Sequence, residues 1–151
     1  MSAFVAFLHH IAAFALVAAL VVEFMLIRGA LTVDNARKLQ IADQIFGAAA
    51  GIVLIAGVLR VLYFEKGTSY YLSSVPFIAK VSLFALVGLV SIYPTVVFLS
   101  WRRDIKQGRA PTIEAAKLGR LRAIIHWELA GIVLLILCAA LMAKGVWYLA
   151  S

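Results

Sequence analysis

Four long apolar stretches alternate with short polar segments along the chain. They run from about residue 3 to 27, 41 to 64, 76 to 101 and 121 to 148. A helix needs about 20 predominantly apolar residues to cross the ~30 Å hydrocarbon core of a bilayer, and each stretch reaches that length. A helix also satisfies its own backbone hydrogen bonds, which lipid cannot do for it. The pattern therefore predicts four membrane-spanning helices.

The polar connections between these stretches differ strongly in charge. The second, "EKGTSYYLSSV", has one acid and one base, whereas the first and third are basic. Because an excess of Lys and Arg marks cytoplasmic loops, we predict an all-α, integral membrane, antiparallel four-helix bundle with both termini on the outer side. It forms a single domain over residues 1–151, with a polar turn at residues 34–38 and a basic cytoplasmic loop at 102–120. The basic residues in and beside the two cytoplasmic connections are Arg28, Arg37, Lys38, Arg102, Arg103, Lys106, Arg109, Lys117, Arg120 and Arg122.

Composition supports a membrane protein and excludes the usual soluble classes. Hydrophobic residues make up 65% of the chain and charged residues 14%, whereas soluble domains have about half and about a quarter. The net charge of +7 would suggest a nucleic-acid partner in a soluble protein. Here most of it is concentrated near one loop, so it indicates orientation, and no nucleic acid is expected. The expected environment is a lipid bilayer, the inner membrane if the source is bacterial.

Several ionisable residues fall inside the predicted spans, where they are costly and mark candidate functional sites. His9 and Glu23 are fourteen positions apart in the first span, which places them within about 40° of each other on a helix. Polar residues at membrane depth should face the interior together, so His9 is expected to face inward and His10 to be the weaker candidate. The predicted outer group contains His9, His10, Arg60, Tyr63, Lys80 and Lys144.

A second group of polar residues falls in the predicted inner half of the bundle. Glu23 and His126 come out at similar depth in the first and fourth spans. They are expected to form either a structural pair that ties these spans together, or a proton-relay step or second metal site. The full group contains Glu23, Asp43, Gln44, Tyr93, His126 and Glu128.

The outer group is rich in bases at a depth where no carboxylate is expected apart from Glu65 at the interface. Such a cluster in a low-dielectric site should bind an anion or keep a base neutral. A b-type heme (heme b) would meet both needs, because its iron binds imidazole and its propionates pair with Arg or Lys. We expect His9 as an axial ligand, Lys80 or His10 as the second, and Arg60 on a propionate, with Tyr63 nearby. The alternative is that Lys80 and Lys144 extend to the interface and that Arg60 is an interfacial anchor.

Small residues in the second span suggest a close helix approach. Gly47 and Gly51 are spaced by four in "GAAAG", and small residues at this spacing allow helix backbones to meet. Packing within the bundle, a homodimer face, and room for a flat cofactor all remain open.

The segments "FLHH", "RVLYFEKGTSYY", "PFIAK" and "LVSIYPT" resemble those of a small bacterial family of four-span membrane proteins of unknown function. The resemblance covers essentially the whole chain. More distantly, the pattern is similar to the HemJ-type protoporphyrinogen IX oxidases and to the membrane domain of CopD copper-resistance proteins. The HemJ-type resemblance implies b-type heme and a functional histidine and lysine, which correspond by position to His9 and Lys80.

Three classes of function are therefore open. The first is a heme-binding membrane oxidoreductase that transfers electrons from a lipid-soluble reductant, a quinol or a porphyrinogen. The second is transition-metal handling, with copper bound by His9, His10 and His126, although soft Met and Cys ligands are scarce. The third is a structural or small-transporter bundle whose polar residues satisfy one another.

Overall fold

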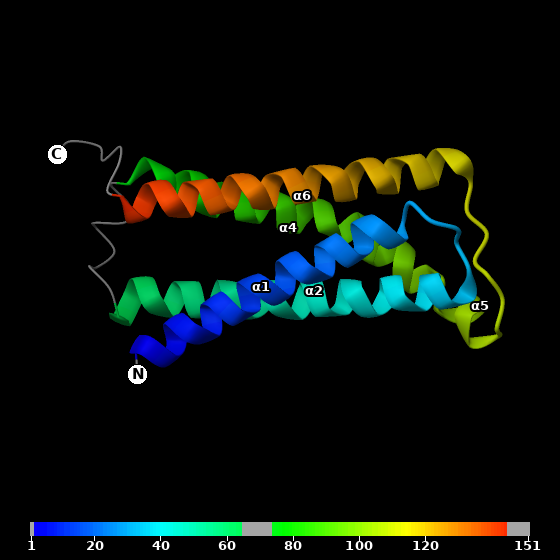
Figure 1. Ribbon diagram of the computed structural model, residues 1–151, viewed down its shortest axis with the longest axis horizontal. Helices are drawn as coiled ribbons and strands as arrows, with labels where there is room; N and C mark the ends of the chain where they lie inside the picture. Colours follow the sequence, from blue (N-terminus) through cyan, green and yellow to red (C-terminus); the bar gives the residue numbers. More distant parts are fainter. Residues whose placement is uncertain (1, 65–73, 145–151) are drawn as a thin grey trace.

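The computed structural model describes residues 2–64 and 74–144, and within these ranges the regular elements are all helices (Figure 1). Four of the helices are long and apolar enough to cross a membrane. The predicted all-α, four-span membrane bundle is therefore confirmed. The helices are α1 (Ser2–Leu26), α2 (Val33–Leu59), a π-helical extension η1 (Arg60–Phe64), α4 (Val75–Ser100), the short α5 (Arg102–Lys106) and α6 (Ala115–Ala143).

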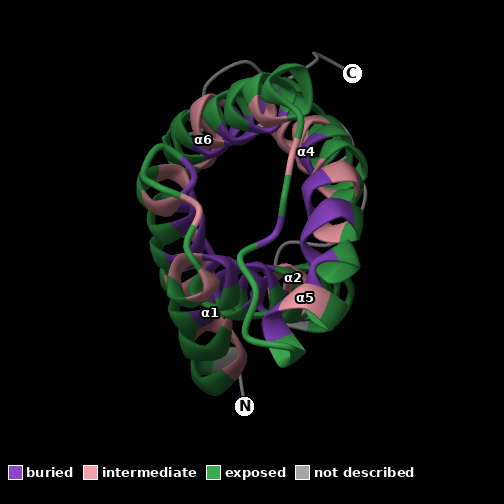
Figure 2. Ribbon diagram, turned by 90° about the vertical axis from the view of Figure 1, so that its right-hand side faces the viewer, coloured by how far each residue is buried: buried purple, intermediate pink, exposed green. Residues whose placement is uncertain are grey.

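The four long helices form a ring in which α1 neighbours α2 and α6, and α4 completes the circle (Figure 2). Contacts are densest within the α1–α2 pair and the α4–α6 pair, and sparser between the two pairs. Neighbouring helices run antiparallel (Figure 1). We call the end where α1 and α4 begin the N-terminal end. The opposite end, which holds α5 and the basic connections, is the basic end.

The first connection differs from the prediction, because residues 34–38 are the first turns of α2 rather than a turn between helices. The Thr32 hydroxyl caps this helix by accepting a hydrogen bond from the Asn35 backbone N–H at 3.1 Å. Asp34 and Lys38, one helical turn apart, form an ion pair at 2.6 Å. A capped, charged first turn is a normal helix start in water. Hydropathy marked where the helix enters lipid, not where it begins.

The last helix also begins earlier than its predicted span. Residues 115–120, expected to belong to the basic loop, are continuous with the rest of α6. Within that loop, α5 is followed by Gly108, whose backbone has a φ of +67°, a conformation that glycine adopts without strain. The predicted final residues of the fourth span, 145–148, lie outside the described residues.

The tightly packed core lies in the half of the bundle towards the basic end. Phe98 is fully buried and its ring centroid is 5.2 Å from that of Trp101. Gln40 donates from Nε2 to the Phe98 carbonyl at 2.5 Å, and Arg122 donates from Nε to the Ile27 carbonyl at 2.9 Å. These bonds join α2 to α4 and α6 to the end of α1. The largest fully buried apolar side chains here are Leu20, Ile27, Leu39, Phe98, Leu121 and Ile125.

The outside of the bundle is apolar along its length. Phe14 of α1 and Leu89 of α4 are about two-thirds or more exposed, and many other large apolar side chains are similarly placed. Exposure of this kind would promote aggregation in water, whereas lipid solvates it. The protein is therefore a multi-pass membrane protein.

Candidate functional site

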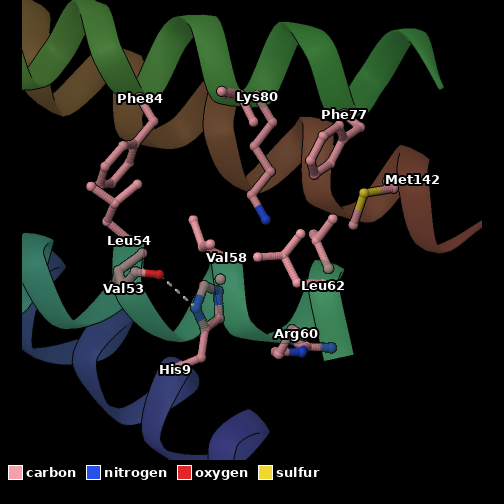
Figure 3. A pocket seen from close by; sticks show the side chains of 13 residues that line it. His9, Val53, Leu54, Val58, Arg60, Leu62, Phe77, Lys80, Phe84 and Met142 are labelled. Atoms are coloured by element: carbon pink, nitrogen blue, oxygen red, sulfur yellow. Dashed lines mark hydrogen bonds between the residues drawn. The ribbon is translucent and has the colours of Figure 1, made fainter. Parts of the chain in front are cut away.

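A cavity of about 320 Å³ opens at the N-terminal end, between the two helix pairs. All four long helices contribute to its lining, α1 through His9 and α6 through Met142. Most of the described wall is aliphatic or aromatic, and three of its side chains carry basic nitrogen: His9, Arg60 and Lys80 (Figure 3). Mostly apolar walls with a few convergent polar groups are typical of small-molecule sites. We call this cavity the histidine pocket.

The ring of His9 is oriented by a hydrogen bond to the neighbouring helix. Its Nδ1 lies 3.1 Å from the Val53 carbonyl oxygen of α2 (Figure 3). A carbonyl can only accept, so Nδ1 carries the proton, and a neutral ring keeps its lone pair on Nε2. Gly57 lies beside the same ring: a Cβ built there would be 3.5 Å from His9 Cε1. The Val53 carbonyl therefore favours one tautomer of His9, and the absence of a side chain at Gly57 leaves room for the ring.

Two cationic side chains share the pocket with His9. Lys80, from α4, extends across the cavity with Nζ directed towards the side on which His9 lies (Figure 3). Arg60 caps the end of α2, and both side chains are half-buried. The positive charges of Lys80 and Arg60 are both close enough to influence the His9 ring. Among the described residues that line the pocket none is acidic, so this part of the wall carries basic groups and no carboxylate.

Three members of the predicted outer group do not line the pocket. His10 faces outward and its Nδ1 donates to the Ala6 carbonyl of its own helix at 2.6 Å. Tyr63 is 72% exposed, and Lys144 follows α6 with its side chain exposed. The inward orientation of His9 and the outward orientation of His10 agree with the helical-wheel prediction.

The second predicted group is partly assembled inside the bundle, towards the basic end. Glu23 and Glu128 are each 2% exposed, and Asp43 is 5% exposed. All three are therefore buried in the bundle interior, so carboxyls from α1, α2 and α6 share one interior region. Asp43 Oδ1 accepts a 2.7 Å hydrogen bond from the Thr95 hydroxyl of α4. We call Glu23, Asp43 and Glu128 the carboxylate cluster.

His126 is not part of this cluster, and the expected Glu23–His126 pair does not form. Its side chain is exposed, with ring centroids 6.1 Å from Phe24 and 6.0 Å from Trp127. His126 and Glu128 are two positions apart on one helix, about 200° around its axis. Only one of them can face the interior, and Glu128 does. The other two residues of that predicted group are placed less deeply: Gln44 is exposed and Tyr93 is partly buried.

Sequence reasoning missed two polar residues of this interior, Gln40 and Thr95. Gln40 is 9% exposed and lies three positions before Asp43, on the same face of α2. That spacing is visible in the sequence and could have revealed it. Thr95 lies on α4 and contacts Asp43 of α2 only through the packing of the two helices, and the sequence pattern of a single helix does not predict such a contact.

Metal ligation by several side chains finds no support in the described part of the chain. Within residues 2–64 and 74–144, no three His, Cys, Asp or Glu side chains are grouped closely enough to hold a metal ion. His9 and His10 are neighbours, with ring centroids 5.8 Å apart. His126 lies near Phe24, towards the basic end. The three histidines considered for copper do not form a common site.

Comparison with known proteins identifies the family. A family model described as "Predicted membrane protein (DUF2214)" matches residues 1–147, and the chain belongs to that family. No curated protein and no solved structure shows significant similarity to it. The expected membership of a family of membrane proteins is confirmed, whereas the likeness to HemJ-type oxidases and to CopD stays a prediction.

Proposed function

We propose that this member of a family of predicted membrane proteins binds b-type heme in the histidine pocket and acts as a membrane redox protein. The observation that carries the proposal is the 3.1 Å hydrogen bond from His9 Nδ1 to the Val53 carbonyl. Metal-ligating histidines usually donate their second ring N–H to a carbonyl or carboxylate, which fixes the tautomer and the ring orientation. His9 has this support in place before any ligand binds.

The chemistry of the pocket wall fits the same group. Its aliphatic and aromatic side chains suit an apolar macrocycle, and the cations of Arg60 and Lys80 suit propionates. His9 would hold the iron through Nε2. Lys80, which reaches across from α4, would bind the iron as a second protein ligand or pair with a propionate. When bound, such a group supplies one-electron redox chemistry.

The apolar residues around the pocket would also determine which class of electron donor can reach it. A pocket within an apolar, lipid-exposed bundle favours a lipid-soluble donor, a quinol or a porphyrinogen, and disfavours a water-soluble one. The apolar walls exclude water, which strengthens the electrostatic influence of Arg60 and Lys80 on whatever binds. The activity would be that of an oxidoreductase.

The proposal includes a location and an oligomeric state. By the distribution of basic residues, the pocket would lie in the outer half of a bacterial inner membrane. Gly47 is exposed on α2, and a Cβ at Gly47 or Gly51 would meet nothing within 4 Å. This open, small-residue face would suit a homodimer contact between two copies of α2.

The test is the absorption spectrum of the purified protein after expression with added heme precursor. We expect a Soret band that shifts on reduction with dithionite, and one heme per chain by the pyridine assay. The adjacent histidines provide matched variants: His9→Ala should lose the band, and His10→Ala should keep it. Lys80→Ala should change the band position if Lys80 is an axial ligand, and should weaken retention of heme without a shift if it holds a propionate.

Two outcomes would overturn the proposal. One is the absence of a Soret band in the wild-type protein both after expression and after reconstitution with hemin. The other is equal loss of heme in His9→Ala and His10→Ala, because heme held in the histidine pocket should depend on His9 and not on the outward-facing His10.

A further inference from the structure

The carboxylate cluster lies apart from the histidine pocket and takes no part in the proposed heme binding. On α1, Glu23 is fourteen residues after His9, about 21 Å along the helix axis. The cluster is built from three helices, and the fourth contributes the Thr95 hydroxyl. It is therefore a second polar site of the bundle interior.

Two oxygens of the cluster are buried without a partner. Among the described residues, no group donates a hydrogen bond to Glu23 Oε1 or to Glu128 Oε1. Both side chains are 98% buried, since each is 2% exposed. Burying an unsatisfied polar oxygen costs on the order of 1–3 kcal/mol, and burying an uncompensated charge costs far more. A purely structural role would be served better by apolar side chains, so the cluster indicates a ligand.

The surroundings of the cluster carry little compensating positive charge. Among the described residues, the Thr95 hydroxyl of α4 donates to Asp43. Gln40 lies three positions before Asp43 on α2 and bonds to the Phe98 carbonyl, and the partly buried Tyr93 of α4 packs against the core. Two basic side chains of α6 are directed elsewhere: Arg122 donates to the Ile27 carbonyl, and His126 faces outward. Ionising all three carboxyls together would be costly in such a region, because like charges repel strongly at low dielectric.

Protons fit this arrangement better than a metal ion. The cluster does not bring its oxygens into a group that could hold a metal. Protons need no such convergence, because each carboxyl can bind its own. A protonated carboxyl is neutral and also gains an O–H donor for a neighbouring oxygen. Proton binding would therefore remove the charge and satisfy the orphaned oxygens together.

A groove on the outside of the bundle gives access to one member of the cluster. A cavity of about 210 Å³ between α4 and α6 is lined by Glu128 and by apolar side chains. Two of these, Leu86 and Trp127, are more than half exposed and face lipid. Glu128 is thus enclosed by protein and still reachable from the lipid side.

We propose that Glu23, Asp43 and Glu128 form a proton-binding site in the interior of the membrane bundle, with Glu128 as the member reached from lipid. Its ligand is the proton, taken up and released by carboxyls contributed by both helix pairs. The site is independent of heme. It would operate whatever the histidine pocket binds.

The test uses dicyclohexylcarbodiimide on the wild-type protein in lipid nanodiscs, with labelled residues located by mass spectrometry. This lipid-soluble reagent needs a protonated carboxyl: the acid proton moves to a carbodiimide nitrogen and the carboxylate oxygen bonds to the central carbon. Rearrangement then leaves a stable N-acylurea that contains the whole reagent. Glu128 should be labelled at neutral pH, and above the midpoint each further pH unit should reduce labelling about tenfold.

The controls and the overturning results are specific to this site. Glu114 and Asp104, on the basic connection, should remain unlabelled because they face water. Glu128→Gln should abolish the signal. Absence of labelling at Glu128 even at acid pH would overturn the proposal. So would protection by Na⁺ at constant pH, because it would identify a cation site instead. Neither result depends on heme, so this proposal and the heme proposal can fail separately.

Discussion

Helices α4 and α6 approach each other closely at Gly131, and this contact allows a quantitative prediction. A Cβ built on Gly131 would lie 2.7 Å from Val87 Cγ2. Non-bonded carbon atoms normally sit about 3.5–4.0 Å apart, so the overlap is roughly 0.8–1.3 Å. Val87 is 7% exposed, and a valine in a helix has one strongly preferred rotamer. The methyl group therefore cannot turn away cheaply.

We expect Gly131→Ala to destabilise the bundle through overpacking, by about 1–3 kcal/mol. Replacing glycine by alanine also favours the helix by up to about 1 kcal/mol, and this gain must be removed from the comparison. Gly88→Ala measures it, because Gly88 lies in α4 and a Cβ there would meet nothing within 4 Å. The difference between the two variants isolates the clash.

The assay is unfolding of the purified protein in mixed micelles with increasing SDS, followed by tryptophan fluorescence. Val87→Ala should relieve the clash, so the double variant should be more stable than the sum of the single effects by about the overpacking energy. The reasoning is refuted if Gly131→Ala is as stable as Gly88→Ala. It is also refuted if the two substitutions are additive.

Two further substitutions separate the pocket from the small-residue face of α2. Gly57→Leu should lower the affinity for heme at least about tenfold, equivalent to ~1.4 kcal/mol. The reason is that the leucine side chain would displace the ring of His9, whose Cε1 lies 3.5 Å from the Cβ position. An unchanged affinity in a heme titration would count against the placement of the ligand beside His9. Gly47→Leu should leave the heme spectrum intact but remove the proposed dimer in chemical crosslinking of membranes, since a bulky side chain on the proposed contact face would keep the helices apart. A dimer that persists in this variant would exclude that face.

Hydropathy located the spans well and the helix ends poorly. The four spans follow from apolar length alone, because the bilayer demands that length. Val33 and Ala115 begin their helices in polar sequence, where hydropathy carries no signal and local chemistry decides. At Val33 the deciding signals were present in the sequence: a Thr32 cap and an Asp34–Lys38 pair one helical turn apart.

The candidate sites were predictable as far as helix periodicity reaches. The separation of His9 from His10 followed from the wheel of α1, and the same reasoning on α6 would have chosen Glu128 over His126. Contacts between helices were out of reach. The Val53 carbonyl that orients His9, and the Thr95 hydroxyl that holds Asp43, depend on how the helices rotate against one another. No pattern within one helix encodes that rotation.

The ring of helices has its sparsest contacts between the α1–α2 pair and the α4–α6 pair, and both polar sites lie across that seam. His9 faces Lys80 across it, and the carboxyl of Asp43 meets Thr95 across it. A ligand that binds only when the halves are docked adds its binding free energy to the docking, about 2.7 kcal/mol at a hundred times Kd. If the sites hold their proposed ligands, the association of the two halves is thermodynamically linked to binding at those sites. Ligand binding at either site would then stabilise the association of the α1–α2 pair with the α4–α6 pair.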